Sequence, residues 1–168
     1  MKRKKGFRAF FIFAFISFIL LNGCGYSVHR YSSLPFTEIK IGLIENRTLE
    51  PRLQDKLHKA LTEEFLNHGI SINPAAGLKI TGIIHNFDMV VLSEKNGVAV
   101  EYQIVIKADF RIIDEKGDIK DIKNISSPFI VSFSGAEEFG RLLANRDVAE
   151  ERALSDVAMQ IVGSLIYK

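Results

Sequence analysis

The chain has only one cysteine, Cys24, among its 168 residues. A single thiol cannot form an internal disulfide, so a hydrophobic core has to hold the fold together. Catalytic signatures are lacking as well: HExxH, GxSxG, P-loop and GxGxxG patterns do not occur, and the four histidines form no close metal pair. These absences predict a protein that is not an enzyme, with no catalytic residues, no metal and no cofactor.

Long apolar runs are also lacking, apart from 13 residues at positions 9–21. A membrane-spanning helix needs about 20 apolar residues, so this run is too short to span comfortably. A basic start followed by about 7–15 apolar residues is typical of an export signal. The sequence therefore predicts a signal peptide over residues 1–23, with the basic residues Lys2, Arg3, Lys4, Lys5 and Arg8 in front.

The net charge depends on this signal. The whole chain carries +2, but five of its 22 basic residues and none of its 20 acidic residues lie in the first 23. The remaining 17 basic and 20 acidic residues give a net charge of −3, and this charge provides no case for nucleic-acid binding. The 145 residues from 24 to 168 suffice for one domain with its own core. We expect residues 24–36 to be a tether and residues 37–168 to be globular.

The residues before the cysteine resemble the bacterial lipobox. Leu21-Asn22-Gly23-Cys24 has an aliphatic residue at −3 and a small residue at −1, although Asn22 departs mildly from the usual type. The resemblance implies cleavage before Cys24, an S-diacylglycerol on its thiol and acylation of the new N-terminus. One acyl chain binds a membrane only marginally, whereas two or more anchor it stably. The alternative is an ordinary signal peptide with an incidental cysteine.

Four strands follow from period-two alternation and turn signals. The clearest is the third, in which Tyr102, Ile104 and Ile106 lie on one face and polar side chains lie on the other, so it is half-buried. Asn96-Gly97 before it is a strong hairpin signal. The second strand alternates imperfectly, which allows a bulge. The predicted strands are residues 38–44, 78–92, 98–113 and 129–133.

Two helices follow from apolar residues at helical spacing. The first is predicted over residues 51–68, because Pro51 suits the first helical position and Gly69 suits a C-terminal cap. The second is predicted to begin after Asn145, whose side chain can cap it. The element order is strand, helix, three strands, helix. The expected fold is α+β, a two-layer sandwich of a mixed four-stranded sheet with both helices on one face.

Several short segments together resemble the LptE family of lipopolysaccharide-assembly lipoproteins. The resemblance covers most of the chain after the signal. Each motif is short and degenerate, so the specificity lies in their order. The matching segments are Cys24-Gly25-Tyr26, Leu34-Pro35, residues 39–51 (IKIGLIENRTLEP), residues 57–65 (LHKALTEEF), Asn96-Gly97 and Glu101-Tyr102-Gln103.

This resemblance implies a function without covalent chemistry. Such proteins plug a large outer-membrane β-barrel of the LptD type, help it to assemble, and assist the insertion of lipopolysaccharide into the outer leaflet. The expected location is the outer membrane, lipid-anchored, facing the periplasm or within the barrel lumen. The alternative is an accessory lipoprotein of a different envelope complex. A hydrolase would require a nucleophile–base pair, and the sequence nominates none.

The resemblance also implies residue roles. The family has a basic residue just before Asn-Gly at the hairpin tip and another before the last helix, and Lys95 and Arg146 fit these places. Both are expected to contact lipopolysaccharide phosphates, Lys95 more loosely because lysine lacks the bidentate fork of arginine. The alternative is that both are solvated loop charges. Asn46, Arg47 and Glu50 are expected to fix the turn from the first strand to the first helix.

Overall fold

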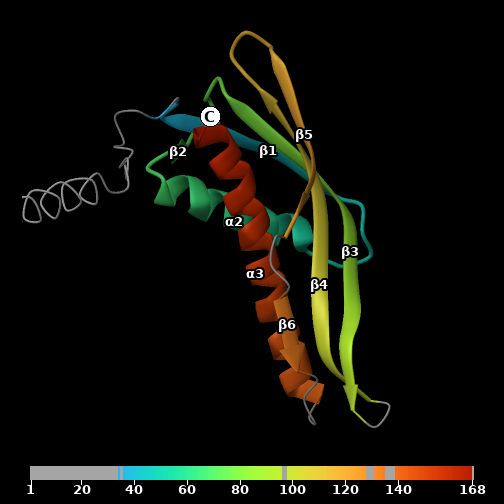
Figure 1. Ribbon diagram of the computed structural model, residues 1–168. Helices are drawn as coiled ribbons and strands as arrows, with labels where there is room; N and C mark the ends of the chain where they lie inside the picture. Colours follow the sequence, from blue (N-terminus) through green and yellow to red (C-terminus); the bar gives the residue numbers. More distant parts are fainter. Residues whose placement is uncertain (1–33, 35, 96–97, 128–130, 135–138, 168) are drawn as a thin grey trace, which may run out of the picture. The chain divides into compact units, whose positions relative to one another are not determined.

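The structure is a computed structural model that describes residues 34, 36–95, 98–127, 131–134 and 139–167 (Figure 1). The chain divides into two units, Met1–Arg30 and Tyr31–Lys168, and every described residue belongs to the second. The predicted signal peptide, Cys24 and most of the predicted tether lie outside the described residues. The described fold is therefore that of the second unit alone.

Five strands lie side by side in the order β2-β1-β3-β4-β5, and β6 pairs with a separate stretch of β4 (Figure 1). β1 is parallel to both β2 and β3, whereas β3, β4, β5 and β6 pair in antiparallel fashion. A helix between β1 and β3 permits the parallel pairing, whereas the few residues that separate β3 from β4 and β4 from β5 leave room only for antiparallel pairing. The strands are β1 Glu38–Asn46, β2 Ser71–Ile72, β3 Lys79–Lys95, β4 Val98–Ile113, β5 Ile119–Ser126 and β6 Val131–Ser134.

Two helices, α2 (Leu53–Asn67) and α3 (Phe139–Ile166), bury their apolar stripes in one core with the inner face of the sheet. Each fully buried Leu or Ile side chain contributes about 1.5–3 kcal/mol to folding. The predicted α+β fold, with a mixed sheet covered by helices, is therefore confirmed. The fully buried core includes Leu57, Leu61 and Phe65 of α2, Leu154, Val157 and Ile161 of α3, and Ile39, Ile80, Ile84, Ile104 and Ile106 of the sheet.

The C-terminal end of α2 follows the prediction. Gly69 has a φ of 74°, its N–H donates to Leu66 O at 2.9 Å, and the N–H of Ile70 donates to Phe65 O at 2.9 Å. This pair of bonds is the Schellman motif, in which a left-handed residue satisfies the last helical carbonyls. Buried Ile70 belongs to the same core cluster as Phe65, which fixes the direction of the chain after the helix.

Both predicted helix starts are wrong. α2 begins at Leu53, because Arg52 takes a left-handed conformation (φ 65°) and leaves Pro51 in the preceding turn. α3 begins at Phe139, six residues before the predicted cap, so Asn145 lies inside the helix. The intervening residues 141–144 (RLLA) are strong helix formers, and they outweigh the capping preference of one asparagine.

The predicted number of strands is also wrong, since the sequence indicated four and missed β2 and β5. β2 has only two residues. β5 carries mostly exposed side chains, with only Ile122 and Ile125 packed against the core, so its charged sequence shows no clear alternation. The bulge allowed in the second predicted strand is confirmed: the β3–β4 register shifts between Ile84 and Asn86.

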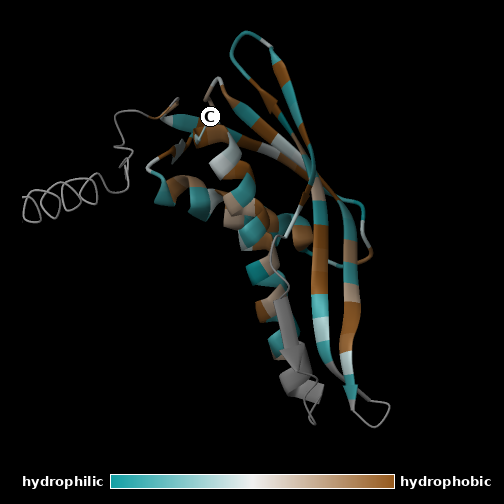
Figure 2. Ribbon diagram, in the orientation of Figure 1, coloured by the Kyte–Doolittle hydropathy of each residue, from teal (hydrophilic) through white to brown (hydrophobic). Residues whose placement is uncertain are grey.

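β3 and β4 continue well beyond the end of β1 as a long hairpin, here called the distal hairpin, β3 residues 85–95 with β4 residues 98–107 (Figures 1 and 2). Lys95 pairs with Val98 at its end, while the predicted turn residues Asn96 and Gly97 lie outside the described residues. β6 lies along the β4 side of this hairpin. None of the helices among the described residues has the length and apolar character needed to span a membrane.

Candidate functional site

Arg146, a predicted lipopolysaccharide contact, lies in an ion cluster between elements that are distant in sequence. Its Nη2 donates to Glu50 Oε2 in the β1–α2 turn. Its Nε lies 3.1 Å from Glu150 Oε1, close enough for an ion pair but without forming a hydrogen bond. The guanidinium carbon lies 5.7 Å from the centre of the Phe87 ring, within cation–π range. Arg146 thus joins α3 to the β1–α2 turn and to β3.

Glu150 is the centre of this cluster, because its side chain is only 2% exposed. Lys56 Nζ donates to Glu150 Oε2 at 2.6 Å and to Asp147 Oδ1 at 3.2 Å. Burial lowers the pKa of Lys56, but the hydrogen bonds to Glu150 and Asp147 outweigh that effect and leave the pKa above its usual range. A buried carboxylate with cations on two sides is energetically tolerable, whereas an unpaired one is not. The cluster therefore fastens α2 to α3.

The turn from β1 to α2 is fastened mainly by Asn46. Its Oδ1 accepts from the Thr48 N–H at 3.0 Å and from the Thr48 hydroxyl at 2.8 Å, and its Nδ2 donates to Glu50 O at 2.7 Å. These bonds place the Glu50 side chain toward Arg146. The Arg47 side chain instead pairs with Glu45, at 2.9 Å, on an exposed surface.

The two predicted lipopolysaccharide contacts are not brought together. Lys95 is the last residue of β3, and its side chain is outside the part of the chain that the structure describes. Arg146 packs over Phe87, which lies eight residues before Lys95 on the same strand. At about 3.3 Å per residue, this separates the two positions by about 26 Å along β3. They cannot hold the same phosphate group. Arg146 also lies within α3, not before it as predicted.

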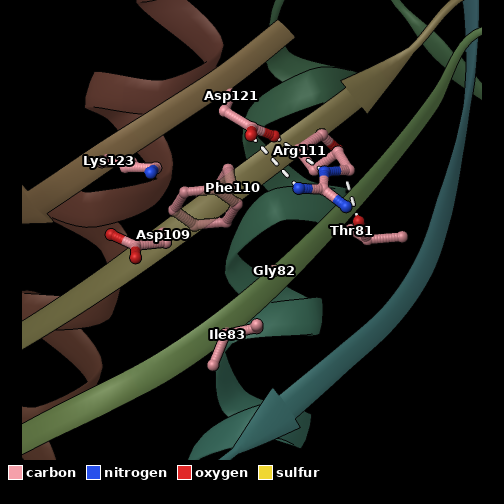
Figure 3. Close-up of a pocket in the computed structure, with 8 residues that line it drawn as sticks. All are labelled: Thr81, Gly82, Ile83, Asp109, Phe110, Arg111, Asp121 and Lys123. Carbon is pink, nitrogen blue, oxygen red and sulfur yellow. Dashed lines mark hydrogen bonds and ion pairs between the residues drawn. The ribbon is translucent and has the colours of Figure 1, made fainter. Parts of the chain in front are cut away.

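A pocket of about 190 Å³ opens on the face of the sheet away from the helices (Figure 3). Arg111 Nε donates to Asp121 Oδ1 at 2.7 Å, which lowers the pKa of Asp121 and raises that of Arg111. Asp109 accepts the Asn124 N–H at 2.7 Å. These groups already have partners and are not arranged as an acid–base pair. The other lining residues are Thr81, Gly82, Ile83, Phe110 and Lys123.

Within the described ranges, no group of three or more His, Cys, Asp and Glu side chains could hold a metal ion. The main feature that sequence reasoning missed is the pairing of Lys56 with Glu150. The spacing of Arg146 and Glu150 is that of an i,i+4 helical pair and could have been recognised. Lys56 and Glu150 are 94 residues apart, so no local pattern connects them.

Comparisons with known proteins identify the family of this chain. A model of the family described as "LptE: Lipopolysaccharide-assembly" matches residues 36–165, well over half of the chain. Curated proteins gave no match.

Several solved structures are similar in fold. Rare lipoprotein B from Shewanella oneidensis aligns with a TM-score of 0.54 and 14% identity, over 75% of this chain and 92% of that one. An uncharacterised lipoprotein B from Nitrosomonas europaea aligns with a TM-score of 0.53 and 14% identity, over 83% of this chain and 88% of that one. A minor lipoprotein from Acinetobacter baumannii aligns with a TM-score of 0.51 and 12% identity, over 79% of this chain and 92% of that one.

Identities this low establish a shared fold and nothing further. The family match spans both helices, the ion cluster and the distal hairpin, and agrees with the resemblance found in the sequence. On this basis, the chain belongs to the LptE family of lipopolysaccharide-assembly lipoproteins.

Proposed function

We propose that this protein is an outer-membrane lipoprotein, anchored through acyl chains on Cys24, that plugs an LptD-type β-barrel and helps it to assemble. In this role it also assists the insertion of lipopolysaccharide into the outer leaflet, without covalent chemistry. The observation that carries the proposal is the family match over residues 36–165.

The outer face of the sheet supports a plug. The lumen of a large outer-membrane barrel is polar, so a plug needs a polar exterior. On β4 the buried residues alternate with Lys107, Asp109 and Arg111, which point away from the helices. Arg111 is paired with Asp121 on this face, so the surface offers hydrogen bonding without a large charge of either sign.

We assign the phosphate contacts to Lys95 and Arg146, with different weights. Lys95 is the last residue of β3 and lies far from the ion cluster. The carboxylates of that cluster therefore do not compete with a phosphate for Lys95. The side chain of Arg146 is 29% exposed and engages two carboxylates, so a phosphate must use the guanidinium donors that remain. We therefore expect Lys95 to contribute more to phosphate binding than Arg146.

Two measurements test this function. Affinity purification of the tagged full-length chain from detergent-solubilised membranes, with mass identification, should recover a large β-barrel. Recovery of a different envelope complex instead would favour the accessory-lipoprotein alternative.

For lipopolysaccharide binding, Lys95→Glu should weaken the affinity of the purified protein. Lys116→Glu, the same charge reversal in the exposed β4–β5 turn, should leave the affinity unchanged. Equal effects of the two reversals would remove Lys95 as a specific contact and leave only a general effect of net charge.

A further inference from the structure

The distal part of β3 has one edge to which no described strand pairs. β1 ends its pairing where Asn46 lies opposite Ile84, and the Arg47 N–H donates to Ile84 O at 2.9 Å before the chain turns toward α2. β3 then continues to Lys95 with β4 on its other side only. Figure 1 shows the lower half of β3 as the outermost strand of the sheet.

The most regular part of this edge is the stretch Asn86–Val91, here called the open edge. Register shifts before Asn86 and after Val91 bound it, and within it each residue faces one β4 residue in sequence from Lys107 to Tyr102. Six residues match the usual length of one strand in a globular protein. The open edge can therefore accept a full strand of ordinary length.

The exposure of this stretch is unusual for a half-buried strand. Met89, Val90, Val91 and Leu92 are 46%, 45%, 43% and 44% exposed, so side chains on both faces are equally accessible. Proteins usually protect such edges with lysine or proline. Residues 85–94 contain no lysine, arginine or proline. Asp88 is the one charged residue of the open edge, so Met89, Val90 and Val91 form an apolar part of it that is suited to pairing with another chain.

We propose that the open edge binds an extended segment of a partner protein by strand addition, with backbone hydrogen bonds to β3 and apolar side chains beside Met89 and Val90. In this binding mode the main chain provides affinity and alternate side chains provide specificity. The inference goes beyond the proposed function and does not depend on it.

The charges indicate which segment fits. β3 residues 85–94 carry two exposed carboxylates, Asp88 and Glu94, and on the facing strand exposed Lys107 and Glu101 balance each other. The partner segment should therefore have an apolar centre and a lysine or arginine at its flank. A second copy of this chain fits less well, because its own Asn86–Val91 stretch brings another Asp88 and no lysine or arginine to the pairing.

The test uses the full-length protein in detergent micelles. The probe is an end-blocked decapeptide of alternating valine and threonine with a lysine at each end. Added peptide should slow the hydrogen exchange of those open-edge amides that point away from β4, by about tenfold or more at saturation. The matched control is the same peptide with N-methyl groups on alternate residues, which removes donors to β3 and should abolish the protection.

Two variants give a second, independent reading. Val90→Lys places a charge on the open edge, whereas Gln103→Lys places the same charge on the cross-strand partner of Val90, one strand further in. Peptide affinity should fall at least about fivefold more for the first than for the second. The exchange measurement on the unsubstituted protein stands even if a variant does not fold.

Four results would overturn the proposal: no protection by the peptide, equal protection by the N-methylated peptide, protection by micelles alone, or protection that appears only with self-association in sedimentation. The third would indicate a lipid at this edge, and the fourth a second copy.

Discussion

Arg146 offers the sharpest test of how the two layers are joined. Replacing it with methionine keeps an unbranched, flexible stem but removes the guanidinium, and with it the charge and the contact over Phe87. Glu50 then loses its partner, and Glu150 retains only Lys56, at 2.6 Å. We expect Arg146→Met to lower the free energy of unfolding even when the protein has no ligand.

The magnitude depends on the burial of Glu150. Leaving a buried carboxylate with no partner costs about 3–5 kcal/mol. Glu150 is 2% exposed but keeps Lys56, so only part of this cost applies, and the lost cation–π contact adds about 0.5–1 kcal/mol. The single substitution should therefore cost about 2 kcal/mol, which lowers the Tm by about 4–8 °C for a domain of this size.

Removing both cations, in Lys56→Met with Arg146→Met, should reach the full cost of about 3–5 kcal/mol. Adding Glu150→Gln to this pair should recover part of the loss, because a neutral amide is less costly to bury than a charge. The matched control is Arg152→Met, an exposed arginine of the same helix, which should change stability by less than about 0.5 kcal/mol.

Urea unfolding, followed by circular dichroism, measures the free energy of unfolding of these four variants and of the unsubstituted protein. If Arg146→Met and Arg152→Met proved equally mild, the cluster would not join α2 to α3, and the reasoning from the buried Glu150 would be refuted.

Three further predictions concern other parts of the chain. Cys24→Ala should move the protein from the membrane to the soluble fraction in a host without its partner, as fractionation and immunoblotting would show; retention there would contradict a lipid anchor. Gly69→Ala should lower the free energy of unfolding by about 1–2 kcal/mol because Gly69 has a positive φ, whereas Gly163→Ala inside α3 should raise it by about 0.5–1 kcal/mol. Midpoints of urea unfolding that moved in the same direction for both variants would count against this reasoning. Burial raises the pKa of Asp156 more than its hydrogen bond from Ser127 lowers it, so ionisation of Asp156 disfavours the folded state. Asp156→Asn should therefore be more stable than the original at pH 7, with the difference vanishing as the pH falls below the ordinary aspartate range, and an unchanged difference at pH 3 would reject that cause.

The fold was largely predictable because its signals are local. β4 alternates strictly, so its buried face, from Ile104 to Ile112, could be read residue by residue. Gly69 marked the end of α2 because few residues other than glycine adopt its φ. The helix starts were not predictable in the same way: the left-handed Arg52 is set by the turn that Asn46 fastens, and that turn depends on how β1 meets the rest of the sheet.

The site was less predictable because its contacts are not local. Arg146 was selected by family position, yet its partner Glu50 lies 96 residues away and Lys56 meets Glu150 across 94 residues. Charges at these spacings show no periodicity, so sequence alone assigned Arg146 to a loop and to a ligand. The structure adds a second set of partners, with which any lipopolysaccharide phosphate has to compete.

The length of the distal hairpin has a mechanical consequence. From Ile84, where β1 leaves the sheet, to Lys95 there are eleven residues, or about 36 Å of strand. Over this length, a tilt of about 5° at the base of the hairpin would displace its end by about 3 Å, roughly the length of one hydrogen bond. Arg146 packs over Phe87, three residues beyond Ile84, so such a tilt would displace the position of Lys95 far more than that of the ion cluster.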